Sequence, residues 1–196
     1  MNNSATSIII LAAGNSSRLG VPKQLLEYKN KSFLRLIAEK ALEVQPSEVI
    51  AVLGFESDRM QREFEDWPIR IVLNHAWTEG IASSIRTGIN TVHSQADAAL
   101  IALCDQPAVT TELLSQLISL CSHEKPIAAT EYNQILGVPA CFDRSIFPEL
   151  LLLQGDVGAK RVIAQDWTRV AAHAFPQAAI DIDTLEDYQK QRFSDA

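Results

Sequence analysis

Residues 8–26, IIILAAGNSSRLGVPKQLL, contain the first predicted strand of the chain and the loop that follows it. An apolar, β-branched run gives way to small residues, after which Gly14 and Gly20 bracket a polar segment and Lys23 follows. A buried strand that ends in a turn of small residues is typical of the first βα unit of an α/β domain. Successive N–H groups in such a turn point into one concavity and can bind an anion. The stretch therefore predicts an anion-binding loop.

Two familiar phosphate-binding loops do not fit this spacing. The dinucleotide pattern GxGxxG needs closely spaced glycines, whereas five residues separate Gly14 from Gly20. The P-loop pattern GxxxxGK[ST] has four residues between its glycines, and here Gln24 stands where its magnesium-binding hydroxyl would be. What remains is a cradle of main-chain donors with two cations, Arg18 and Lys23, and no metal ligand of its own. The alternative is an ordinary turn whose cations are solvated surface charges.

Length and composition predict one globular domain over residues 1–196. The chain is 47% hydrophobic and 21% charged, and its net charge of −7 provides no broad positive field for nucleic acid. No apolar run approaches the ~20 residues that cross a bilayer, and MNNSATS lacks the basic segment of a signal peptide. We expect a cytoplasmic protein with neither a nucleic-acid nor a membrane partner. Its three cysteines are widely spaced and predict core residues rather than a disulfide or zinc site.

Short β-rich runs alternate with longer segments of helical period, which predicts βαβ units on a mainly parallel sheet. Strands are predicted at residues 8–12, 49–53, 69–73 and 98–103, with a fifth in PIAAT, residues 126–130. Helices are predicted at residues 33–44, 58–66 and 82–92, and from Thr110 or Thr111 to about Ser122. The fold class is therefore α/β, with a single Rossmann-like, three-layer domain.

The regularity weakens in the last third of the chain, which predicts a late insertion. Residues 132–142, YNQILGVPACF, predict an irregular or hairpin excursion around Gly137 and Pro139. Further elements are predicted as helices near 145–153 and 158–165, strands in RVAAHAF (169–175) and AIDID (179–183), and a last helix capped by Thr184 that runs to about residue 193.

Aspartates follow two of the apolar runs. Residues 98–109 read AALIALCDQPAV, so Asp105 lies at the carboxyl end of a strand expected beside the first loop. A carboxylate there could hold Mg²⁺ against a phosphate, or could cap the turn made with Pro107. Asp181 and Asp183 also follow a strand-like run, where they could share one face or cap the last helix.

A further polar group opens the helix after the third strand. In WTEGIASSIRTGI, residues 77–89, Gly80, Ser83 and Ser84 could contact a base or a phosphate, or could be ordinary residues of a helix start. The sequence has no HxxxH pair and no GxSxG motif, which disfavours zinc hydrolysis and serine acyl transfer.

These motifs together resemble the MobA-like nucleotidyltransferases. Residues 11–26, LAAGNSSRLGVPKQLL, are similar to the family signature LAAGxSxRxGxPKxLL. The family's later blocks follow in order as WTEGIASSIRTGI, CDQPAV, GVPACF, GDVGAK and DIDTLEDY. The resemblance spans nearly the whole chain, and it is closest to the branch that contains the molybdenum cofactor cytidylyltransferases.

The resemblance implies a nucleotidyltransferase fold and Mg²⁺-dependent transfer of a nucleoside monophosphate from a triphosphate to a phosphate-bearing acceptor. It implies that Arg18 and Lys23 are catalytic and neutralise charge on the α-phosphate and pyrophosphate. Asp105 would bind Mg²⁺, with Asp183 as a second metal contact. The nucleotide-binding set is then Leu11, Ala12, Ala13, Gly14, Asn15, Ser16, Ser17, Gly80, Ser83 and Ser84.

Substrate identity is also implied by the resemblance. Guanylyl-transferring relatives look more like LAGGxSxRMG with an acidic residue before the lysine, whereas Ala13 and Pro22 match the cytidylyl branch, so CTP is expected. The acceptor would be molybdopterin or molybdenum cofactor, with a molybdoenzyme as a further partner. Its binding residues would be Gly137, Pro139, Gly155, Asp156 and Gly158.

The chain departs from the family pattern on the acceptor side. Val138 stands where relatives often have histidine in GHPxxF, Val157 and Lys160 alter a GDxGAR-like block, and Leu185 replaces the proline of DIDTPED. Two alternatives stay open: another triphosphate such as GTP or another acceptor such as a sugar phosphate, and a non-catalytic nucleotide-binding or cofactor-chaperone protein.

Overall fold

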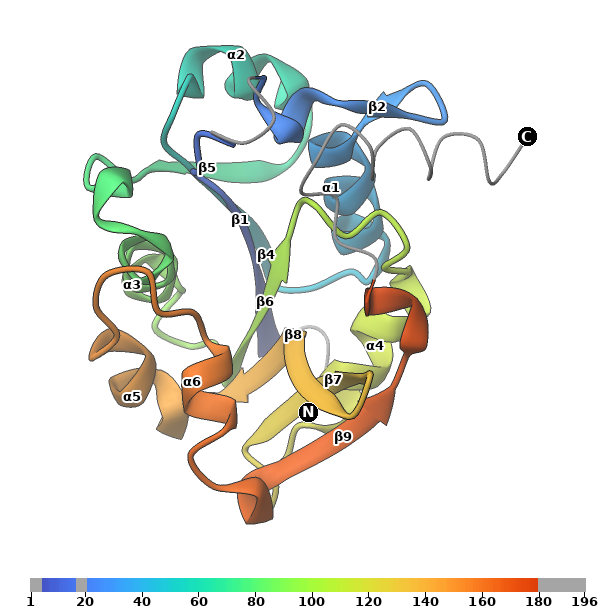
Figure 1. Ribbon diagram of the computed structural model, residues 1–196, viewed down its shortest axis with the longest axis vertical. Helices are drawn as coiled ribbons and strands as arrows, with labels where there is room; N and C mark the ends of the chain where they lie inside the picture. Colours follow the sequence, from blue (N-terminus) through green and yellow to red (C-terminus); the bar gives the residue numbers. More distant parts are fainter. Residues whose placement is uncertain (1–4, 17–20, 180–196) are drawn as a thin grey trace.

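The computed structural model describes residues 5–16 and 21–179, and a mostly parallel sheet of seven strands forms its centre (Figure 1). The strand order is β5-β4-β1-β6-β8-β7-β9. The strands are β1 (Thr6–Ala12), β4 (Glu48–Leu53), β5 (Ile69–Leu73), β6 (Ala98–Leu103), β7 (Ile127–Tyr132), β8 (Ile135–Asp143) and β9 (Val170–Ala174). Only β8 runs antiparallel to its neighbours. The predicted α/β fold class is confirmed.

The first strand is central because both of its faces are apolar. Ile8 and Ile10 pack into one core cluster, while Ile9 packs into the other, and all three are fully buried. Successive side chains of a strand point to opposite faces, so a continuous apolar run needs helices on both sides. Burial of each such side chain contributes roughly 1.5–3 kcal/mol to folding.

The helices form the two outer layers. The layer on the Ile8 side holds α1 (Phe33–Glu43), α2 (Ser57–Gln61) and α4 (Thr111–Leu120). The layer on the Ile9 side holds α3 (Ile81–Thr91), α5 (Phe147–Leu151) and α6 (Lys160–Ile163). Ser32 caps α1 by accepting from the N–H of Arg35, and Thr110, one of the two predicted caps, accepts from the N–H of Leu113. These helices place the loops that follow β1 and β6 at one edge of the sheet.

Several predicted helices are shorter than their sequence patterns indicated. The pattern at residues 58–66 forms α2 and then a 3₁₀ turn at Arg62–Phe64, because only Met60 and Phe64 bury and Asp66 adopts a left-handed conformation. Likewise, the helices predicted at 145–153 and 158–165 shrink to α5 and α6, and a 3₁₀ turn at Arg144–Ile146 precedes α5.

The hairpin alternative for residues 132–142 is confirmed, although Gly137 and Pro139, around which it was predicted, lie within β8 and not in the turn. β8 is inserted between β6 and β7, and the turn at Asn133 and Gln134 has two positive φ angles, as a tight hairpin turn requires. Pro139 has no N–H to donate. Because the register shifts between Ala129 and Thr130, Pro139 has no paired residue on β7, so its missing N–H breaks no pair of the ladder. The strand predicted in RVAAHAF is β9. Residues 180–183 of AIDID and the helix capped by Thr184 lie outside the described residues.

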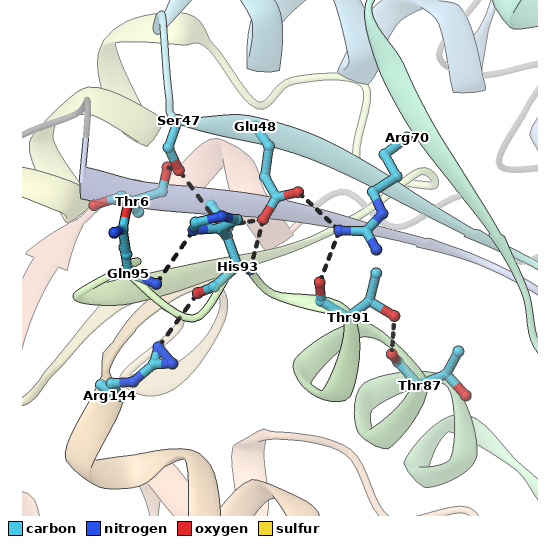
Figure 2. Close-up of polar contacts among 10 residues, drawn as sticks. Thr6, Ser47, Glu48, Arg70, Thr87, Thr91, His93, Gln95 and Arg144 are labelled. Atoms are coloured by element: carbon cyan, nitrogen blue, oxygen red, sulfur yellow. Dashed lines mark hydrogen bonds and ion pairs between the residues drawn. The ribbon is translucent and has the colours of Figure 1, made fainter.

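A polar cluster around Glu48 lies at the amino ends of the strands, opposite the strand ends that carry the predicted loop (Figure 2). The Glu48 carboxylate accepts from Ser7 Oγ at 2.9 Å and from the His93 N–H at 2.8 Å. Arg70 lies within 3.4 Å of the same carboxylate and donates to the Thr91 carbonyl. These bonds tie β1, β4, β5 and the loop after α3 together, so they hold the strands in place at the end away from the predicted loop.

None of the helices within residues 5–16 and 21–179 combines the length and apolar composition needed to traverse a bilayer.

Candidate functional site

A cavity of about 490 Å³ lies at the carboxyl ends of β1 and β6. Open α/β sheets bind ligands at this edge. The wall is built by the loop after β1, the 3₁₀ turn Lys23–Leu25, the start of α3, the loop after β6 and one residue between α5 and α6. The lining residues are Leu11, Ala12, Ala13, Gly14, Asn15, Ser16, Lys23, Gln24, Trp77, Thr78, Gly80, Ile81, Ser84, Leu103, Cys104, Asp105 and Asp156.

An ion pair joins the two segments that the sequence analysis singled out for chemistry. Lys23 Nζ donates to Asp105 Oδ2 at 2.6 Å, and each side chain is 17% exposed. The other oxygen, Asp105 Oδ1, is buried, and no group in the described part of the chain donates to it. An unpaired buried carboxylate oxygen is costly, so this atom is suited to bind a cation or a donor that arrives with a ligand.

Gln24 is a buried residue whose side chain binds the main chain of the loop after β1. Its side chain is 2% exposed, and Nε2 donates to the carbonyl oxygens of Ala12 at 3.1 Å and Gly14 at 2.7 Å. In the sequence, Gln24 stands out only as a departure from the P-loop pattern, and this role was not predicted. The available signal was a polar residue directly before the apolar pair Leu25 and Leu26.

The start of α3 is packed against the loop between α5 and α6. The Gly155 carbonyl accepts from the N–H of Ala82 at 3.1 Å, and the Gly155 N–H donates to Glu79 at 3.2 Å. Arg86 bonds both Glu79 and the Leu153 carbonyl at 2.6 Å, and its hydrogen bond lowers the pKa of Glu79. This packing brings Asp156 of the same loop to the cavity wall.

The two serines of α3 differ in their surroundings. Ser84 lines the cavity, and its Oγ accepts from Asn74 at 3.0 Å. Ser83 lies outside the lining set, and its hydroxyl accepts from Asn74 and donates to the Gly80 carbonyl, each at 2.8 Å. The Ser83 hydroxyl therefore stabilises the helix start. Trp77, which the sequence analysis did not assign, also lines the cavity and packs edge-to-face on Phe55 with ring centroids 5.5 Å apart.

The predicted acceptor residues do not gather on one wall. Gly155 and Gly158 lie in the same loop as Asp156, and Gly158 is close to the Ile81 side chain. Gly137 and Pro139 lie on β8 outside the lining set, and Gly137 packs against the Tyr132 hydroxyl. Gln106, next to Asp105, donates to the Val138 carbonyl at 3.3 Å and so links this strand to the cavity edge. Ser17, Arg18 and Asp183 lie outside the described residues.

A family model for the MobA-like NTP transferase domain matches residues 8–171. The chain belongs to the MobA-like NTP transferase family. Its fold and family are those of nucleotidyltransferase enzymes.

Named relatives of this MobA-like protein cover most of its length. It is 32% identical to nicotine blue oxidoreductase of Paenarthrobacter nicotinovorans over 80% of each chain. It is 22% identical to molybdenum cofactor cytidylyltransferase of Escherichia coli over 98% of this chain and 99% of that one. The solved structure of Rv0371c from Mycobacterium tuberculosis superposes with a TM-score of 0.82 at 30% identity, covering 94% of this chain and 96% of that one. The same protein is also known as a complex with manganese, with a TM-score of 0.78 at 26% identity over 96% of this chain and 98% of that one.

The site residues of this MobA-like domain fit a divalent cation that is shared with a nucleotide. Within residues 5–16 and 21–179, no three His, Cys, Asp or Glu side chains gather closely enough to hold a metal alone. Mg²⁺ commonly takes one or two carboxylates and completes its shell with phosphate oxygens and water. The unpartnered Oδ1 of Asp105 meets the protein side of that requirement.

Cys104 lines the same cavity of the MobA-like domain but is not suited to nucleophilic chemistry. Burial, together with the adjacent Asp105 carboxylate, raises the pKa of its thiol to about 12. The thiol is therefore protonated at neutral pH, and thiolate attack or thiolate metal binding is disfavoured.

We predict that Gly80→Ala destabilises this MobA-like domain. Gly80 has φ +122° and ψ −177°, a region essentially restricted to glycine, and an added Cβ would lie 2.5 Å from the Gly155 oxygen. The cost should be at least about 1 kcal/mol, and differential scanning fluorimetry should show a Tm lower by about 2 °C or more. Gly158→Ala is the matched control, because its nearest neighbour would lie at 3.8 Å. Equal Tm values for the two variants would contradict the proposed packing of the Gly155 loop on α3.

Proposed function

We propose that this protein transfers CMP from CTP to molybdopterin or to its molybdenum-loaded form, with release of pyrophosphate. The proposal rests mainly on one juxtaposition. A small-residue loop lined by Ala12–Gly14 lies in the same cavity as the Lys23–Asp105 pair, which comes from positions 82 residues apart in the chain. Ala13 and Pro22 support the choice of CTP. Relatives named as molybdenum cofactor cytidylyltransferase and guanylyltransferase both match the chain, which supports the acceptor more than the base.

In this reaction a phosphate oxygen of the acceptor forms a bond to the α-phosphorus, and the bond from that phosphorus to the oxygen bridging to the β-phosphate breaks. Pyrophosphate leaves with the electron pair of the broken bond. The reaction needs no protein nucleophile, because positioning and charge stabilisation lower the barrier. A bound Mg²⁺ would neutralise phosphate charge and align the reacting groups.

The chain's own residues supply the rest of the mechanism. The cavity wall at Gly14–Ser16 would bind the triphosphate through main-chain N–H groups. The ion pair holds the Lys23 ammonium group at the wall, where it would neutralise charge on the departing pyrophosphate. Asp105 would hold the cation through Oδ1, and Asp156 on the facing loop would contact the acceptor. A molybdoenzyme would then receive the product.

A second candidate function is redox chemistry in the same cavity. It is favoured by one observation, the 32% identity with a relative named nicotine blue oxidoreductase. The loop lacks the GxGxxG spacing, so a nicotinamide dinucleotide would have to be held through its phosphates by the same main-chain N–H groups.

The deciding experiment supplies CTP, GTP, ATP or UTP with Mg²⁺ and measures pyrophosphate release with and without purified molybdopterin. We expect release with CTP only, and only when molybdopterin is present. CTP turnover without molybdopterin would overturn the acceptor assignment, and preference for GTP would overturn the base assignment. Nucleotide binding without turnover would indicate a non-catalytic binding protein. A parallel assay of NADH and NADPH oxidation by absorbance tests the redox alternative.

A further inference from the structure

Gln24 is a buried polar residue for which the proposed reaction has no direct use. It is 2% exposed, although it lies beside Lys23 at the edge of the cavity. Its amide nitrogen donates to two carbonyl oxygens of one loop, those of Ala12 at 3.1 Å and Gly14 at 2.7 Å. Both amide hydrogens are therefore used to hold the main chain of the loop that follows β1.

These two bonds fix the direction of the peptide groups. Because a trans peptide is planar, its N–H points away from the side on which its C=O lies. With the Gly14 carbonyl held by Gln24, the Asn15 N–H points away from Gln24, and the Ala13 N–H does so for the Ala12 carbonyl. In the described part of the chain, the Asn15 N–H donates to no protein acceptor, and neither do the neighbouring N–H groups of Gly14 and Ser16. The peptide of the Gly14 N–H is held separately, because its Ala13 carbonyl accepts from the Phe55 N–H at 3.1 Å.

A second contact extends the same arrangement to Lys23. The Ser16 hydroxyl donates to Gln24 Oε1 at 3.4 Å and accepts from the Lys23 N–H at 2.9 Å. Ser16 has a φ of +50°, so the loop bends in a left-handed conformation at this residue. The Gln24 amide thus contacts both the loop and the residue that anchors the main chain of Lys23.

We propose that Gln24 is a positioning residue that holds the loop open as a preformed cradle for a linear polyphosphate. This inference rests on the proposed function for the ligand class, a nucleoside triphosphate, but it adds how the cradle is kept in shape. A loop whose N–H groups are already oriented binds phosphate without having to order itself first. Loss of the Gln24 donors would let the Ala12 and Gly14 carbonyls turn toward the phosphates and repel them.

The test uses inorganic tripolyphosphate with Mg²⁺ as the probe, titrated calorimetrically into the full chain. Gln24→Met keeps the length of the side chain and removes both donors, and we expect its affinity to fall at least about tenfold. Gln116→Met makes the same chemical change at an exposed position of α4 and should bind like the unaltered protein. Equal affinity of Gln24→Met and the unaltered protein would overturn the proposal.

Gln24→Glu provides a readout that a merely structural role would not move. An ionised glutamate has no hydrogen to donate to the two carbonyls, whereas a protonated one can donate to one of them. The affinity deficit relative to the unaltered protein should therefore shrink as the pH falls from about 8 to about 5.5, since burial among carbonyl oxygens favours the protonated acid. An ionised glutamate also repels phosphate, so Thr78→Glu, which brings a carboxylate to another lining position of the cavity, is the reference. A Gln24→Glu deficit that shrinks with pH no more than the Thr78→Glu deficit would overturn the positioning role. If Gln24→Met does not fold, this pH profile alone decides.

Failure of the inference can be told apart from failure of the proposed function. Tripolyphosphate binding by the unaltered protein that weakens in Gln24→Met supports the cradle, even if CTP and molybdopterin give no turnover. Absence of tripolyphosphate binding by the unaltered protein would overturn the inference, even if CTP is a substrate.

Discussion

Asp105→Ala should lower the rate of nucleotidyl transfer by at least about a hundredfold, the scale of a major electrostatic contact in a water-poor site. The variant loses a buried carboxylate oxygen at the cavity to which no group in the described residues donates a hydrogen bond. It should also need more Mg²⁺ for half-maximal activity, because the cation would then be held by phosphates and water alone. Steady-state kinetics across a Mg²⁺ titration measure both effects.

Asp97→Ala is the control for this change. Asp97 directly precedes β6, the strand that Asp105 follows, but it is exposed and lies at the opposite end of that strand. It should leave turnover and Mg²⁺ dependence unchanged. Near-normal turnover of Asp105→Ala would remove Asp105 from the proposed metal role.

Lys23→Ala is expected to lower turnover to a similar extent, again by at least about a hundredfold. The change removes the cation 2.6 Å from Asp105, and it leaves a carboxylate that is only 17% exposed without its ion pair, facing the site proposed for the triphosphate. Truncation of one partner of a buried pair costs more than the pair contributes, because the other charge is left uncompensated. The matched control is Lys31→Ala, since Lys31 forms an exposed ion pair with Glu39, which contributes little.

The double variant separates a joint role from two independent ones. If Lys23 and Asp105 act as one unit, Lys23→Ala with Asp105→Ala should be no more than about tenfold slower than the slower single variant. Independent roles would multiply the two losses to about ten-thousandfold. The second outcome would contradict the coupling that the ion pair indicates.

Most of the fold could be predicted because its signals are local. The runs at 8–12, 49–53, 69–73 and 98–103 all form strands. Three of them, β1, β4 and β6, are buried on both faces and are therefore almost wholly apolar, whereas the edge strand β5 is only partly buried and includes the exposed Arg70. The cap at Thr110 was also predictable, because capping depends on the next few residues. The lengths of α2, α5 and α6 were not, because they depend on how much of each segment finds a partner to pack against, whereas α3 and α4 lie within about two residues of their predicted bounds.

The candidate site was predicted in its residue types more than in its arrangement. The loop after β1, Lys23 and Asp105 were singled out from the sequence, and they line one cavity. Ser83 and Ser84 looked alike in sequence, and Asn74 donates to both hydroxyls, yet only Ser84 lines the cavity, while the Ser83 hydroxyl donates to the Gly80 carbonyl at the helix start. Gln24 and Trp77 were missed because their roles depend on contacts with residues that are separated from them in the sequence and brought close only by folding.

From the order of its residues alone, this protein shows an α/β domain that opens with a small-residue loop, a cation after it and an aspartate at a later strand end. Periodicity, glycine spacing and capping depend on residues a few positions apart, so these signals predict local structure without knowledge of the fold. Tertiary structure decided that β8 enters the sheet antiparallel between β6 and β7, that Gly80 packs on Gly155, and that Lys23 meets Asp105. Those contacts join residues far apart in the chain, and their geometry is set by how the layers pack, which no local pattern encodes.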